Sequence, residues 1–260
     1  IFGREASLDL QGAFLATTAE SLAFPNGEVF SARNPQSPSL LTISIPLGLQ
    51  YGTQASAAIT AQDSELSVEP GRSLILAGGD INLNNSVLTV NQPEGGRIEL
   101  GAIAGAGTVG LVMNGEQLSL EIPDTLERAD SSLTGTTLSV VAEDGGDIAI
   151  TAQDLDILAS TLQAGIAPGR STADAQAGDI TLNTTGTLNI GQASNISNFV
   201  FTNAFGSSGD INIFAETLSV TDGSQLDAST FGLGDAGNVM IEVTKTAAFD
   251  GFNSLNGNAS

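Results

Sequence analysis

Apolar and polar residues alternate in a figure that recurs along the second half of the chain. In its clearest form, Gly209-Asp210-Ile211-Asn212-Ile213 is followed after four residues by Leu218-Ser219-Val220. Related figures begin at Gly79, Gly146 and Gly178, and a partial one begins at Gly237. Residues two apart lie on the same side of a β-strand. We therefore predict short strands in which Ile211, Ile213, Leu218 and Val220 face a core while Asn212 and Ser219 face outward.

The spacing of these figures predicts the fold class. The later ones begin at residues 146, 178, 209 and 237, which gives periods of 32, 31 and 28 residues. Self-similarity at such a period, with short strands and no helical pattern between them, indicates a β-solenoid. At roughly 25 residues per turn we expect about ten turns. Glycine tolerates positive φ, and aspartate can bond its own downstream backbone, so each Gly-Asp pair predicts a tight turn.

The remaining sequence is less regular. We expect a strand around Leu41, Ile43 and Ile45, and an excursion or hairpin over residues 113–136, where the period is lost. Residues 137–260 read as the regular array, with extra residues collecting in loops on one side. Such loops often carry a binding surface. Both ends of the sequence look cut, and the first residues show neither the basic nor the apolar region of a signal peptide.

Four stretches in the first 101 residues carry a resemblance to a known family. They are Phe2-Gly3-Arg4-Glu5-Ala6-Ser7-Leu8-Asp9-Leu10, Phe14-Leu15-Ala16-Thr17-Thr18-Ala19, Pro46-Leu47-Gly48-Leu49-Gln50-Tyr51-Gly52 and Gly95-Gly96-Arg97-Ile98-Glu99-Leu100-Gly101. Together they resemble the haemagglutination-activity domain of two-partner secretion exoproteins of the filamentous haemagglutinin type. The resemblance covers residues 1–112, as the C-terminal part of that secretion domain, and β-helix repeats would follow it. It implies an all-β, right-handed parallel β-helix that is exported through an outer-membrane partner transporter and is secreted or displayed at the cell surface.

Composition excludes several classes of function. The chain has 29 acidic and 7 basic residues and a net charge of -22, which argues against nucleic acids and anionic lipid surfaces as partners. No apolar run approaches the roughly 20 residues that span a membrane, so we expect no membrane insertion. Cysteine and histidine are absent, which excludes disulfides, thiolate metal sites and imidazole catalysis.

Two patterns of catalytic interest have simpler explanations. Gly105-Ala106-Gly107-Thr108-Val109-Gly110 fits the dinucleotide fingerprint G-x-G-x-x-G, but a turn follows it where the fingerprint requires a helix. Asp154 and Asp156 should share an outer face, as should Glu143 and Asp147 if their strand continues. Paired carboxylates of this kind occur in polysaccharide-cleaving enzymes. Because no cluster of basic residues lies near them, we expect solvated acids and no enzyme, and we predict no cofactor.

Two further groups of residues remain open in the sequence. The turn aspartates Asp80, Asp147, Asp179 and Asp210 would line one edge of the solenoid if their turns are equivalent, and a bridging calcium ion is then conceivable. Arg97 interrupts that column and Asn238 ends it, so we favour turn capping and predict no metal site. Phe199, Phe201 and Phe205 fall in a variable segment; we expect core positions for the first two, with a contact patch for a glycan or protein as the alternative.

Three functions therefore stay open. The first is a secreted or surface-displayed structural and adhesive rod, whose partners are the outer-membrane transporter and a host or environmental glycan or protein. The second is a β-helical enzyme that acts on polysaccharides. The third is a passive repeat scaffold with its activity elsewhere.

Overall fold

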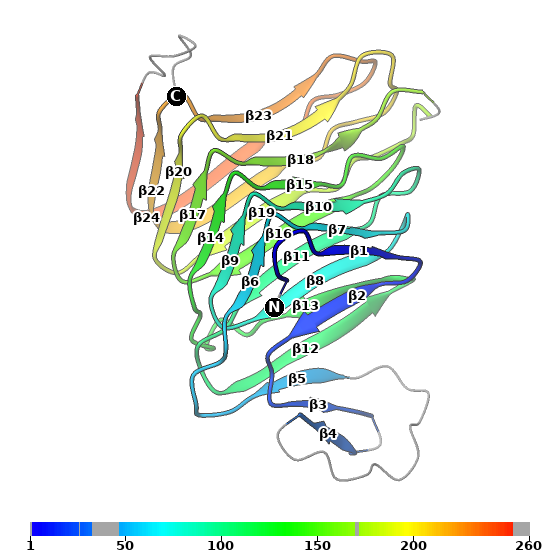
Figure 1. The fold of residues 1–260 in the computed structure, drawn as a ribbon. Coiled ribbons are helices and arrows are strands. Elements are labelled where there is room, and N and C mark those ends of the chain that lie inside the picture. Colours follow the sequence, from blue (N-terminus) through cyan, green and yellow to red (C-terminus); the bar gives the residue numbers. More distant parts are fainter. Residues whose placement is uncertain (1, 26, 33–46, 170–171, 252–260) are drawn as a thin grey trace.

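The computed structural model describes residues 2–25, 27–32, 47–169 and 172–251, and these residues form an all-β molecule. The predicted strand around Leu41 lies outside them. Most strands run parallel to their neighbours and stack in layers from the N-terminal to the C-terminal end (Figure 1). In the described residues, no helix is long and apolar enough to cross a membrane.

The first sheet has seven parallel strands. In spatial order they are β1 (Ser7–Leu10), β7 (Glu65–Val68), β10 (Val87–Val90), β15 (Thr137–Ser139), β18 (Thr161–Ile166), β21 (Asn195–Val200) and β23 (Gln225–Thr230). Each pair is in register without a shift, as in Leu162 beside Ile196 and Ile196 beside Leu226. The described residues form seven stacked turns where about ten were expected, because the chain leaves the stack to form further strands, such as β12 (Gly107–Asn114) and β13 (Gln117–Glu121).

The second sheet has twelve strands and folds into two arms. The first arm holds β2 (Phe14–Thr17), β8 (Ser73–Gly78), β11 (Arg97–Ala102), β16 (Asp147–Ala152) and β19 (Ile180–Thr184). The second arm holds β20 (Thr187–Gly191), β17 (Leu155–Leu158), β14 (Ser131–Thr134), β9 (Ile81–Asn84) and β6 (Ile59–Gln62). The long strand β22 (Ile211–Thr221) pairs with β19 through its first half and with β20 through its second, and β24 (Val239–Asp250) pairs with β22.

Each turn of the chain therefore supplies three strands, one to the second arm, one to the first sheet and one to the first arm. Their inward side chains stack in columns, as in Ile98, Ile148, Ile180 and Ile211, all fully buried. The inward positions predicted for Ile211, Ile213, Leu218 and Val220 are confirmed, since none is more than 1% exposed. These columns form one continuous core. Full burial of one such side chain contributes about 1.5–3 kcal/mol to stability.

The repeats differ in phase from the sequence prediction. Ile148, which follows Gly146-Asp147, pairs with Ile98 in the first arm. Ile81, which follows Gly79-Asp80, instead pairs with Ile59 in the second arm. The Gly79 figure is therefore not equivalent to the later ones, because the same local pattern marks two different corners of a turn. In the first arm, the position equivalent to Gly146-Asp147 in the preceding turn is occupied by Gly96-Arg97.

A third, antiparallel sheet lies outside this stack. Its order is β13 (Gln117–Glu121), β12 (Gly107–Asn114), β5 (Gly48–Tyr51), β3 (Ser21–Ala23) and β4 (Val29–Ser31). The excursion predicted for residues 113–136 contains only the second strand of the β12–β13 hairpin, and Ser131 already pairs with Ile81 in the stack. The division of the chain into residues 1–112 and 137–260 stays a prediction.

Candidate functional site

The third sheet covers the outer surface of β2, β8 and β11 through a second apolar core. This core includes Leu49, Ile75, Ile103, Val109 and Leu126, all buried. At Gly101 the cover is so close that an added Cβ would lie 2.8 Å from Leu120 Cδ1. A larger residue there would require the side chains of Leu120 and Ile122 to shift. The first turns thus differ from later ones in carrying a second layer.

A buried carboxylate joins the two layers. Glu99 is 5% exposed, and its Oε2 accepts hydrogen bonds from Arg97 Nε at 2.8 Å and from the Leu120 amide at 3.0 Å. Ser73 Oγ accepts a bond from the Leu118 amide at 2.8 Å in the same way. These two side chains satisfy amides of β13, the last strand in the order of its sheet, which would otherwise be unpaired. They also fix its register on the stack.

Arg97 links this joint to the column of turn residues. It lies in register with Asp147, and its Nη1 donates to Asp147 Oδ2 at 3.1 Å. Burial by itself would lower the pKa of Arg97, but its hydrogen bonds and charge interactions with Glu99 and Asp147 outweigh that effect and raise the pKa. The guanidinium therefore stays charged. Arg97 lies in the column of Asp147 but does not interrupt it as predicted, because Ser73 and not Asp80 is its partner in the preceding turn.

The turn aspartates bond to the next turn instead of their own backbone. Oδ1 of Asp147 accepts the Asp179 amide at 2.9 Å, Oδ1 of Asp179 accepts the Asp210 amide at 2.8 Å, and Oδ1 of Asp210 accepts the Asn238 amide at 2.7 Å. The expected Asx turn is thus replaced by a cap that runs between turns. Among the described residues, no group of three or more acids is arranged to hold a metal ion.

Asp80 belongs to a separate acidic column. Its Oδ1 accepts the Asp130 amide at 3.3 Å, and Asp130 Oδ1 accepts the Asp154 amide at 3.2 Å. These residues, with Asp156, line a polar groove of about 410 Å³ on the second arm. Asp154 and Asp156 share this outer surface, as expected. Their oxygens accept bonds from the Thr187 amide and from Asn189 Nδ2, so each carboxylate already has a donor in the next turn.

The other sequence candidates lie apart from this groove. Glu143 and Asp147 are not on one strand, because Gly145 and Gly146 turn the chain with positive φ between them. The glycine-rich stretch at 105–110 leads into β12, a strand where the dinucleotide fingerprint needs a helix. Phe199 and Phe201 are half-buried on the outer surface, so the expected core positions are wrong, and Phe205 is 43% exposed.

Sequence reasoning missed a ladder of buried hydroxyl groups at one corner of the stack. Each member after the first accepts a hydrogen bond from the amide of the member in the preceding turn, at 3.0–3.5 Å. The residue before each member has positive φ. The signal was a Ser or Thr followed two residues later by Leu or Ile, and the members are Ser64, Ser86, Thr136, Ser160, Ser194 and Ser224.

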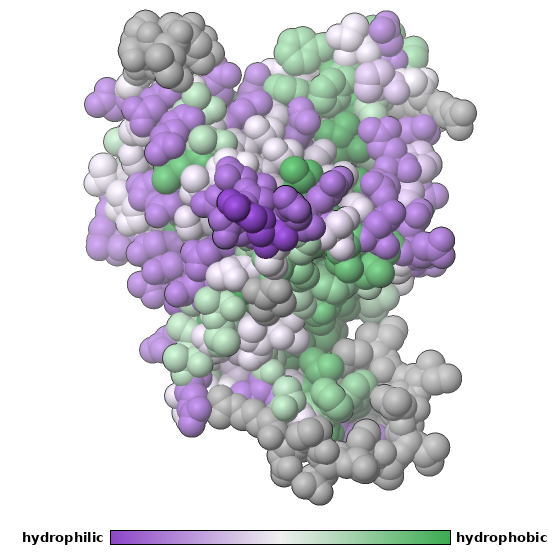
Figure 2. Space-filling view, viewed as in Figure 1, coloured by the Kyte–Doolittle hydropathy of each residue, from purple (hydrophilic) through white to green (hydrophobic). Residues whose placement is uncertain are grey.

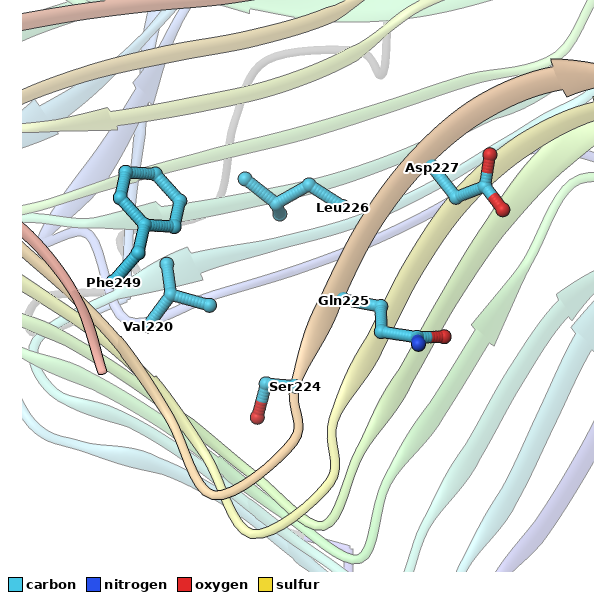
Figure 3. Close-up of a pocket in the computed structure, with 6 residues that line it drawn as sticks. All are labelled: Val220, Ser224, Gln225, Leu226, Asp227 and Phe249. Atoms are coloured by element: carbon cyan, nitrogen blue, oxygen red, sulfur yellow. The ribbon is translucent and has the colours of Figure 1, made fainter. Parts of the chain in front are cut away.

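The C-terminal end of the stack has an open apolar surface. Val220, Leu226 and Phe249 line a pocket of about 300 Å³ there, and Phe249 is 50% exposed. Figure 3 shows these three side chains grouped together, while Gln225 and Asp227 point to the other side of β23. Within the described residues no further strand pairs with β24, so the inward columns end here without a covering layer.

Comparison with known families decides what this architecture is. The family model of the TPS secretion domain matches residues 1–150, more than half of the chain. The chain belongs to the TPS secretion domain family. Its TPS secretion domain marks it as a two-partner secretion exoprotein, which the outer-membrane transporter of the system recognises and which is exported to the cell surface or the extracellular space. No match was found among curated proteins or solved structures.

The TPS match includes the whole third sheet and the joint at Glu99. It ends at Ile150, so the turns that carry β19 to β24, with the exposed Phe205, Phe231 and Phe249, lie beyond it. The third sheet covers only the first turns, and among the described residues the later turns carry no second layer.

Proposed function

We propose that this chain is a structural and adhesive part of a two-partner secretion exoprotein, built as a right-handed parallel β-helix. One observation carries the proposal: three parallel strands per turn pair in register with their counterparts in the next turn along the whole stack. Connections between parallel strands of one sheet are right-handed in about 98% of cases. Strands about 4.8 Å apart make seven turns a rod of roughly 30 Å.

Export through the transporter fits the way this fold forms. The turns are stabilised by contacts with their sequence neighbours, so each new turn has a template in the one before it. Residues 7–17 supply β1 and β2, which pair with β7 and β8 and thereby begin both sheets. We assign the chain no catalytic role; the donors already bonded to Asp154 and Asp156 support this assignment.

A secretion assay tests the proposal. The chain, placed behind a signal peptide, is expressed with its transporter, and the amount outside the cell is measured. Deleting Gly3–Ala19 should abolish the extracellular protein, whereas the outward substitution Asn212→Asp should leave it unchanged. Normal secretion of the deletion would remove the export role of the first turns. Beads coated with folded chain should adhere to host or environmental surfaces more strongly than beads coated with denatured chain; equal adhesion would remove the adhesive role.

A further inference from the structure

Apolar side chains gather on the outer surface of the last turns, beyond the TPS match. Figure 2 shows hydrophobic surface at the upper right, over the turns that follow β21 and β23. Phe205, Phe231 and Leu233 are 43%, 60% and 66% exposed, and Phe199 and Phe201 are half-buried beside them. We call these five residues the aromatic patch. Exposed apolar groups in such a cluster mark interaction surfaces.

The aromatic patch is held in one arrangement before any partner binds. The ring of Phe199 contacts Phe201 and Phe231 edge-to-face, with centroids 5.9 and 5.3 Å apart. The backbone of Phe199 also packs tightly on the neighbouring turn. At Gly165 of that turn, with φ +131°, an added Cβ would lie 2.1 Å from the Phe199 carbonyl oxygen. Binding to such a surface costs little ordering of side chains.

Phe199 and Phe205 lie in turns that have neighbours on both sides, whereas Phe231 and Leu233 belong to the last turn of the first sheet. Strand β21, which carries Phe199, pairs with β18 on one side and β23 on the other. The segment of Phe205 is also flanked on both sides, through the Gln176–Ser207 and Phe205–Leu233 bridges. Phe199 and Phe205 therefore reach the surface sideways, on turns that already have a neighbour on each side.

Acidic groups surround the aromatic patch. Asp227 of β23 has the same parity as Phe231, which directly follows that strand, and Asp235 follows Leu233 by two residues. The basic residues that the structure describes pair with acids elsewhere: Arg4 with Asp63, Arg72 with Glu116, Arg97 with Glu99, Arg128 with Asp124, and Lys245 with Glu216. Among the residues that the structure describes, the charged groups next to the patch are thus acidic, in a chain of net charge -22.

We propose that the aromatic patch binds a protein segment in which apolar side chains alternate with Lys or Arg. The apolar side chains would cover the rings, and the cations would meet the acidic rim. A second copy of the chain would bring a second charge of -22 and would be repelled. A neutral sugar could cover the rings but would bring no cation to the acidic rim. The inference gives the proposed adhesive role its partner class and rests on it.

The experiment measures binding of a labelled peptide of alternating Leu and Lys to the purified 260-residue chain. Peptides of alternating Leu and Glu and of alternating Ser and Lys are the controls for charge and for apolar content. The Leu/Lys peptide should bind and the other two should bind at least about tenfold more weakly. Export is not measured, so failure here leaves the secretion assay untouched.

Variants locate the binding. Phe231→Ser with Leu233→Ser should lower the affinity about tenfold or more, and Asp227→Asn with Asp235→Asn should reduce its dependence on salt. If the double variant unfolds, Leu233→Ser alone replaces it in the binding measurement, because Leu233 takes no part in the contacts between the rings. The matched control is Val112→Ser with Met113→Ser, because these residues are 44% and 39% exposed on the hairpin. The control should bind as the unchanged chain does.

Three results would overturn the proposal. One is equal affinity of the patch variants and the hairpin control, which would mean binding to the general negative charge. Another is binding of a neutral glycan, in place of the peptide, that Phe231→Ser abolishes. The third is a dimer in sedimentation that the patch variants dissociate.

Discussion

The hydroxyl ladder makes a quantitative prediction at Ser160. Its side chain is 2% exposed, accepts the Thr136 amide at 3.0 Å and donates to the Leu158 carbonyl at 2.8 Å. Ser160→Ala removes the oxygen and leaves the buried Thr136 amide without a partner. An unsatisfied buried donor costs about 1–3 kcal/mol. We expect a loss of that size in the free energy of unfolding, and faster hydrogen exchange of the Thr136 amide.

The ladder also predicts a gradient. The bonds to Ser86 and Thr136 are longer, at 3.4 and 3.5 Å, so Ser86→Ala and Thr136→Val should cost less than Ser160→Ala. Ser119 on the exposed hairpin has only a 3.5 Å contact to Val112, and Ser119→Ala is the matched control. Urea unfolding of the four variants gives the comparison. If Ser160→Ala unfolds at the same urea concentration as Ser119→Ala, the ladder does not stabilise the stack.

Four further predictions follow from single positions. Ile213→Asp should cost several kcal/mol, because it buries a charge in the core, while Asn212→Asp should be nearly neutral; equal melting temperatures would contradict the inward assignment. Ala159 has φ +50°, so Ala159→Gly should stabilise the chain by about 1 kcal/mol, and a lower urea midpoint would disprove the strain. Asp179→Ala should lower the melting temperature and Asp179→Asn should not, with or without calcium; a calcium-dependent rise that Asp179→Asn abolishes would restore the metal site. Burial raises the pKa of Tyr51 to about 12, although the hydrogen bond with the Thr17 hydroxyl opposes this shift. Tyr51 is the chain's only tyrosine, so the ultraviolet titration of the folded chain should centre near pH 12 and not near 10.0.

The sign of the tyrosine effect follows from proton linkage. Unfolded chain loses the phenolic proton near pH 10.0, and folded chain holds it until about 12. The stability due to this group is therefore complete below pH 10 and decreases between pH 10 and 12. A titration centred near 10 in folded chain would mean that Tyr51 is exposed.

The sequence predicts the inward and outward faces of strands because alternation is a local property. It does not predict the phase of the turns, because Gly-Asp before an apolar strand fits the corner at Gly79 as well as the one at Gly146. The register Arg97 with Asp147 settles that phase, and no single strand contains that information. In the sequence, the phase of the turns is marked by the Ser and Thr residues of the hydroxyl ladder, from Ser64 to Ser224, which occupy the same corner of each turn.

The third sheet lay beyond sequence reasoning for a different reason. It joins β5, at residues 48–51, to β12, at residues 107–110, and this pairing spans more than one full turn of the stack. Local patterns show that strands exist there but not that they leave the core. The sequence did hold a signal for the outward position of Phe199 and Phe201. Val200, which lies between them, has the same inward parity as Ile196, so its two neighbours must face outward.

Cysteine pairs test the central claim most directly, since the chain has no cysteine of its own. Asp156 and Asn189 are in register in neighbouring turns, so their Cα atoms should be about 5 Å apart, within the range of a disulfide. Ser219 is in register one turn further on, roughly 10 Å from Asp156. In protein collected outside cells that express the transporter, Asp156→Cys with Asn189→Cys should form a disulfide, and Asp156→Cys with Ser219→Cys should not. Absence of the protein from both the cell surface and the medium, or equal oxidation of the two pairs, would contradict an exported stack of parallel turns.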